Sequence, residues 1–242
     1  MRHYFVIWLI VLSLVPGYGQ QNFQAGETLE YVLHFGPINA GKATGTLTYA
    51  SIDGKRVFHS EMLAVTTGLA DILYKVRDIY GSHFDLMSLL PLKSYRDVSE
   101  GRYKRKDAVT YNHSNGKAYS HTGEHDVPKD IRDMVSVLYY VRSLDFDTIQ
   151  VGDVIPINTF FDDELFPFDI RYRGKEEVKV KIGTFKCLKL VPYVEPGRIF
   201  ESEDDMTLWI SDDLNKIPVR VKFDLVVGSI KCDLAGYSGL KY

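Results

Sequence analysis

The 242-residue sequence contains only two cysteines and no large excess of charge of either sign. Two cysteines are too few for the disulfide framework of a small secreted scaffold. A formal net charge of −3 gives no general affinity for nucleic acid. Signatures of catalysis are also missing, because the chain has no HExxH metal motif, no nucleophile elbow and no glycine-rich phosphate loop. These absences argue against a nucleic-acid-binding protein, and the sequence shows no recognisable catalytic site.

The N-terminus has the pattern of a secretory signal peptide. Arg2 precedes an apolar run over residues 4–15, and small residues stand at the −3 and −1 positions before Gln20. The run is shorter than a membrane span, no cysteine marks a lipid anchor, and no later stretch is long and apolar enough to cross a bilayer. We therefore expect residues 1–19 to be removed and residues 20–242 to form one exported domain, soluble in the periplasm or outside the cell.

Alternation of apolar and polar residues predicts β-strands along most of the remaining chain. It is clearest in a hairpin near the C-terminus, where residues 206–211 and 218–225 alternate on either side of an Asp/Asn-rich turn. Asp53-Gly54 and Asn115-Gly116 are two further hairpin signals. About a dozen short strands exceed what a flat open sheet usually carries. The predicted fold class is all-β in the main, a strongly curled or closed antiparallel barrel-like sheet with one amphipathic helix.

That helix is predicted over Lys129–Leu144, where apolar residues recur at spacings of three and four after a proline. We expect it to plug or flank the sheet. If the sheet encloses a cavity, Ile131, Met134 and Leu138 are the residues expected to line it. Residues 68–74 fit either a short helix or the start of a strand.

Two cysteines and two charged runs are candidates for sites. Cys187 and Cys232 lie on expected strands, and export permits a disulfide between them, although two buried free thiols are the favoured alternative. The basic run Arg102–Lys106, together with Arg96, suits the phosphate groups of lipid headgroups or anionic glycans, or else an exposed edge strand protected by charge. The acidic run Glu201–Asp205 lacks the spacing of a calcium loop, which favours a solvated loop.

Histidines invite a metal hypothesis at one hairpin, because His113, His121 and His125 are close in sequence. A two-residue turn at Asn115-Gly116 would pair Thr110 with His121 and place His113 and His121 on opposite faces. We therefore predict no metal site there, and no cofactor elsewhere.

Several short motifs occur in order along nearly the whole chain after the leader. They are Glu27-x-Leu-x-Tyr31 with Ile38-x-Ala-Gly41, Asp133-Met-Val-Ser-Val-Leu-Tyr-Tyr-Val-Arg142, Gly183-Thr-Phe-Lys-Cys187, and Leu208-Trp-Ile-Ser-Asp-Asp with Ile217-Pro-Val-Arg220. Together they resemble the domain of unknown function 3108 family of exported bacterial proteins. The resemblance implies an all-β, barrel-like envelope protein with no assigned reaction.

The leading functional interpretation is an exported, non-catalytic envelope protein that binds an apolar, lipid-like ligand in a barrel cavity or assists envelope assembly. The alternative is a protein-binding envelope factor that uses the barrel rim and has a filled core, and a hydrolase comes third. The interior volume separates the first two. A barrel packed with the 13 Phe and 16 Tyr side chains of this chain has no room for an acyl chain.

Overall fold

The computed structural model describes residues 21–193, 202–226 and 228–242. The expected signal peptide, residues 1–19, and Glu201 of the acidic run lie outside the described residues. Within the described residues, one antiparallel sheet of 14 strands and a separate pair of strands account for most of the chain. This confirms the predicted all-β class. No helix in the described part of the chain is long and apolar enough to cross a membrane.

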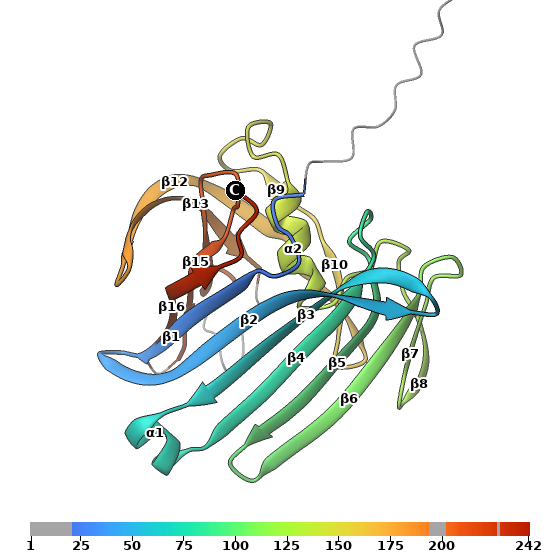
Figure 1. Ribbon diagram of the computed structural model, residues 1–242, viewed down its shortest axis with the longest axis horizontal. Helices are drawn as coiled ribbons and strands as arrows, with labels where there is room; N and C mark the ends of the chain where they lie inside the picture. The colour runs from blue at the N-terminus through green and yellow to red at the C-terminus, as the bar shows by residue number, and fades with distance from the viewer. Residues whose placement is uncertain (1–20, 194–201, 227) are drawn as a thin grey trace, which may run out of the picture.

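The strands follow one another closely along the sequence, and their bounds are β1 Thr28–Phe35, β2 Ile38–Ile52, β3 Lys55–Thr66, β4 Val76–Phe84, β5 Pro91–Glu100, β6 Tyr103–Asn112, β7 Lys117–Ser120, β8 Gly123–Asp126, β9 Val154–Ile155, β10 Asn158–Phe161, β11 Glu164–Pro167, β12 Ile170–Val180, β13 Gly183–Pro192, β14 Met206–Ser211, β15 Pro218–Asp224 and β16 Ser229–Ser238. The large sheet has the order β8-β7-β6-β5-β4-β3-β2-β1-β16-β15-β14-β13-β12-β9, and β10 pairs with β11. The pairing of β1 with β16 joins the N-terminal and C-terminal halves into one sheet. Figure 1 shows this sheet curling strongly around the helix α2, Ser136–Ser143.

The helix α2 begins seven residues later than predicted, at Ser136 instead of Lys129. Arg132 forms a β-bridge with Thr159, and its N–H donates to the carbonyl of Asn158 at 2.9 Å. A backbone engaged with β10 cannot make the bonds of a helix, so the apolar spacing before Ser136 is not helical. The ambiguous segment contains a second helix, α1, Gly68–Leu73.

The hairpin of β6 and β7 also differs from the prediction. Tyr111 pairs with Ala118, and Asn112 pairs with Lys117, so the turn contains four residues instead of two and Thr110 faces Tyr119 instead of His121. The side chain of Asn112 explains the longer turn, because its Oδ1 accepts from the N–H groups of Ser114 and Asn115.

The core lies between the two halves of the sheet, and α2 contacts both. Val137 and Val141 pack against Leu188, Leu190, Leu208 and Ile210 of β13 and β14. Val135, just before the helix, and Tyr139 pack instead with Phe23, Leu47, Phe58 and Phe84 on the N-terminal side. The helix therefore lies between the two halves of the curled sheet and packs against both.

In the C-terminal hairpin of β14 and β15, Leu208 and Ile210 are buried as the alternation predicts. Trp209 is buried as well, in a cluster with Val178 and Cys187. This stretch of β14 is therefore covered on both faces, whereas strict alternation of apolar and polar residues predicts one buried and one exposed face.

Candidate functional site

A small open pocket lies where β4, β5 and β6 meet the segment before α2 and the turn between β10 and β11. Its volume is about 50 Å³. That space holds a few water molecules or a small polar group, whereas pockets for drug-sized ligands measure roughly 300–1,000 Å³. A wider hollow of about 390 Å³ is lined only by residues 97–99 and 104–106 of β5 and β6, so it is a depression on one hairpin rather than an enclosed cavity.

Asp133 is a buried carboxyl group beside this pocket, with an exposed fraction of 3%. Ser82 Oγ donates to its Oδ2 at 2.5 Å, and the N–H groups of Val135 and Ser136 donate to its Oδ1 at 2.7 and 2.8 Å. Burial is the main influence and raises the pKa of Asp133, while these hydrogen bonds act in the opposite direction. The hydrogen bonds fix the turn that precedes α2, because an aspartate side chain that accepts from the next backbone N–H groups stabilises a turn.

Two arginines and two aspartates surround the opening of the pocket. Arg96 lies 2.7 Å from both Asp107 and Asp162, and Arg105 lies 2.5 Å from the same two carboxylates. Each positive charge is therefore matched by a negative one. The opening has no excess positive charge with which to attract an anionic substrate.

The three residues expected to line one cavity do not all come together. Met134 lines the pocket and, with Leu138, packs half-buried against the cluster around Val137, whereas Ile131 is fully buried in a cluster with Tyr111 and Phe160.

The disulfide that export would permit is not formed, because Cys187 and Cys232 are free thiols. Cys187 lies on β13 and Cys232 on β16, with β14 and β15 between them. Three strand spacings of about 4.8 Å exceed the ~7 Å that a disulfide spans between Cα atoms. Burial raises the pKa of each thiol to about 12, so both stay protonated and weakly reactive at neutral pH.

The histidines of the β6–β8 region do not come together around a metal position. Both ring nitrogens of His113 face backbone carbonyls, those of Lys129 at 2.8 Å and Pro91 at 2.6 Å. His121 lies 3.5 Å from Asp107, and His125 bonds to hydroxyl groups within its own hairpin. Among the described residues, no group of three or more His, Cys, Asp or Glu side chains is placed to hold a metal ion.

Sequence reasoning missed a buried ion pair at the centre of the fold. Arg142, in the last turn of α2, donates to both carboxylate oxygens of Glu27 at 2.6 and 2.7 Å, and the two residues are 0% and 2% exposed. Arg142 also donates to the carbonyl of Asn215, and Asn22 donates to the carbonyl of Arg142. The pair therefore ties α2 to the segment before β1 and to the turn between β14 and β15.

Sequence reasoning also missed an exposed apolar surface, which we call the apolar rim. It consists of the turn between β1 and β2 with Phe35 and Ile38, helix α1 with Tyr74, the turn between β5 and β6 with Tyr103, and the turn between β15 and β16 with Val226. Figure 1 shows α1 and the turns after β1 and β5 at one end of the strands. The exposed fractions of its large apolar side chains are high: Phe35 44%, Ile38 56%, Leu69 74%, Ile72 80%, Leu73 84%, Tyr74 54%, Tyr103 52% and Val226 48%.

Comparison with known proteins gives the fold and the family. A crystal structure of a β-barrel-like protein of domain of unknown function DUF1849 from Brucella abortus is similar, with a TM-score of 0.57, 8% identity, and coverage of 89% of this chain and 98% of that chain. A DUF1089 family protein from Pseudomonas aeruginosa covers 81% of this chain and 90% of its own, at 12% identity and a TM-score of 0.34. No curated protein matches the sequence. The first likeness shows that the predicted barrel-like sheet is correct. The sequence profile of the protein of unknown function family DUF3108 matches residues 30–235, and the chain belongs to that family.

Proposed function

We propose that this protein is an exported, non-catalytic envelope protein that acts through its outer surface and carries no lipid inside. The packing of α2 against both halves of the sheet supports this most directly. A sheet of this many strands has a wide interior unless side chains fill it. Here Val137 and Val141 occupy the C-terminal side and Tyr139 the N-terminal side. The pocket beside the segment before α2 measures about 50 Å³. The described residues around this pocket leave an acyl chain no space comparable with a ligand pocket.

A fluorescent fatty-acid probe tests the interior. We expect no saturable, stoichiometric binding inside the wild-type protein, and no change in Met134→Trp, because Met134 lines the small pocket that an acyl chain would have to enlarge. Binding that Met134→Trp abolishes, in a variant whose circular dichroism is unchanged, would contradict the proposal. Binding that survives Met134→Trp but is lost in Leu73→Ser belongs to the apolar rim and agrees with the proposal.

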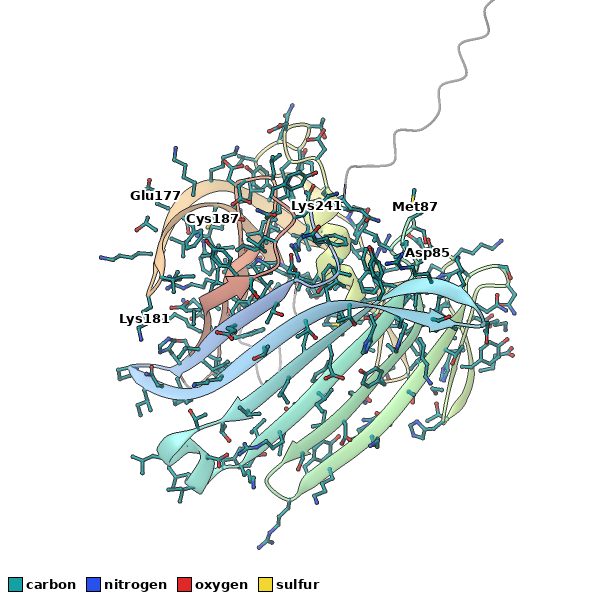
Figure 2. All side chains as sticks on the ribbon, in the orientation of Figure 1. Asp85, Met87, Glu177, Lys181, Cys187 and Lys241 are labelled. Atoms are coloured by element: carbon teal, nitrogen blue, oxygen red, sulfur yellow. The ribbon has the colours of Figure 1, made fainter. Side chains whose placement is uncertain are left out.

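Hydroxyl-radical footprinting in isolated envelopes tests which surface is used. Tyr74 and Tyr103 of the apolar rim should be oxidised less in envelopes than in the purified protein. Met87, which is 60% exposed, is the matched control, and Figure 2 shows it at the end of the strands far from α1. If each of these three residues is oxidised to the same extent in envelopes as in the purified protein, the protein does not act through the rim.

A further inference from the structure

The apolar rim is one connected surface. The N–H of Thr67 donates to the carbonyl of Ala40 at 3.0 Å, which joins α1 to the start of β2. The N–H of Gly101 donates to the carbonyl of Lys75 at 2.8 Å, which joins α1 to the turn between β5 and β6. These bonds hold side chains from distant parts of the sequence at one end of the sheet.

Two glycines allow aromatic rings to bridge neighbouring turns. A Cβ atom at Gly101 would lie 3.0 Å from the ring of Tyr74, and one at Gly228 would lie 3.1 Å from the ring of Phe35. Both glycines have positive φ, 59° and 80°, a conformation that disfavours other residues. The exposed rings therefore rest on the adjacent turns, and the rim is supported rather than made of separate loose tips.

Helix α1 has no buried residue, although Leu69, Ile72 and Leu73 make up half of its six positions. Apolar side chains that project this far from the ends of hairpins do not stabilise the fold by burial. A patch of this kind marks a surface that meets an apolar partner. The side chains protrude from turns and from a short helix, a shape that suits insertion into a flat, deformable layer.

Three positive charges stand beside α1 and the turn between β5 and β6. Lys75, Arg102 and Lys104 are exposed, and within the described part of the chain they form no ion pair. Nearby Asp71 is already matched, since Arg77 Nη1 lies 2.7 Å from its Oδ1. Asp224, near Val226, is matched in the same way by Lys222 at 2.7 Å. The carboxyl groups of Asp78 and Glu100 lie at the same end of β4 and β5. The three cations exceed these two carboxyl groups by one, which leaves a small positive excess beside α1 that attracts anionic groups.

We propose that the apolar rim docks on the surface of an anionic lipid bilayer, with the side chains of α1 inserted at the level of the headgroups and the flanking cations against lipid phosphates. Apolar insertion combined with basic residues is the usual chemistry of interfacial membrane binding. Tyr74 and Tyr103 fit this position because tyrosine rings favour the membrane–water interface. This proposal rests on the proposed function, in which the protein acts through its outer surface.

Vesicle flotation with the mature protein tests the proposal. We expect binding to vesicles of phosphatidylcholine with phosphatidylglycerol, weaker binding to phosphatidylcholine alone, and loss of the difference at high salt. The affinity of the double variant Ile72→Ser/Leu73→Ser for the vesicles should be lower by about tenfold or more, because two inserted apolar side chains are lost. Arg102→Glu/Lys104→Glu should lose the preference for phosphatidylglycerol. Leu214→Ser is the matched control, because Leu214 is 63% exposed in the turn between β14 and β15. This turn lies at the end of β15 opposite to the apolar rim.

A second measurement places the contact. Tryptophan fluorescence of Leu73→Trp should shift to the blue on addition of the anionic vesicles, and that of Leu214→Trp should not. Equal flotation of Ile72→Ser/Leu73→Ser, Leu214→Ser and wild type would overturn the bilayer proposal. Absence of wild-type binding to both vesicles would also overturn it, and protection of the rim in envelopes would then point to a protein partner and leave the proposed function standing.

Discussion

Removing one partner of the buried ion pair should destabilise the protein far more than removing both. Glu27→Met leaves the guanidinium of Arg142 buried without its carboxylate, and Arg142→Met leaves the carboxylate of Glu27 without its donors. Each change strands a group that is at most 2% exposed. The double variant Glu27→Met/Arg142→Met places two apolar side chains of similar length in the same space.

The size of the effect follows from burial. Breaking a buried pair by removing one partner typically costs about 3–5 kcal/mol, whereas replacing both with apolar residues is often close to neutral. Arg142 Nε is buried without a hydrogen-bond partner, so the native pair is not fully compensated, which favours the apolar double variant. For a domain of this size 1 kcal/mol shifts the melting temperature by about 2–4 °C, so each single variant should melt roughly 6–20 °C lower.

Denaturant unfolding of the four proteins forms a double-mutant cycle. We expect the double variant to lose much less free energy of unfolding than the sum of the two single variants, with a coupling of about 2 kcal/mol or more. Single variants that each lose less than about 1 kcal/mol, with additive effects, would show that water reaches the pair. The account of α2 as a helix fixed inside the sheet by Arg142 would then be wrong.

Three further predictions concern export, metal and pH. Intact mass of the exported protein should show that residues 1–19 are absent and that it begins at or near Gln20; an uncleaved product would contradict the leader assignment. Zinc or nickel should raise the melting temperature of the wild type no more than that of His121→Ala/His125→Ala, and a shift lost in that variant would reveal a metal site. Partial burial raises the pKa of Asp85, but hydrogen bonds from a lysine ammonium, a serine hydroxyl and two backbone N–H groups outweigh it and lower the pKa to about 2. Because the folded pKa is below the unfolded one, the ionised group stabilises the fold above about pH 4, and this stability is lost as the pH falls towards 2. The free energy of unfolding of Asp85→Asn should therefore fall less than that of the wild type over this pH range, by about 1 kcal/mol after solvent screening.

Local patterns in the sequence predict the strands well, because alternation along a strand is set by the pleat alone. These local patterns fail where a residue distant in sequence determines the backbone conformation. The spacing of three and four that includes Ile131 and Met134 is real, but Arg132 pairs with Thr159 and prevents a helix there. The hairpin register fails for a nearer reason, because Asn112 stabilises a longer turn than Asn115-Gly116 alone suggests.

The buried ion pair and the apolar rim both depend on contacts between residues far apart in sequence. Glu27 and Arg142 are 115 positions apart, and nothing in either local pattern pairs them. The basic run Arg102–Lys106 suggests headgroup phosphates as one interpretation, yet the apolar residues of α1 that stand beside it come some 30 positions earlier. Only the antiparallel order of β3 to β6 brings these segments to the same end of the sheet.

The segment from Asp133 to Arg142, on which the family resemblance partly rests, has a structural explanation at both ends. Asp133 accepts hydrogen bonds from the N–H groups of Val135 and Ser136 where α2 begins, and Arg142 anchors its last turn to Glu27. This segment holds the helix between the two halves of the sheet, where its residues pack against both. Changes in this segment should therefore reduce stability at both ends of the sheet together, whereas changes in the apolar rim should reduce membrane binding and leave the unfolding transition in place. The two effects separate because no residue of α1 is buried, so its apolar side chains add little to the core that α2 completes.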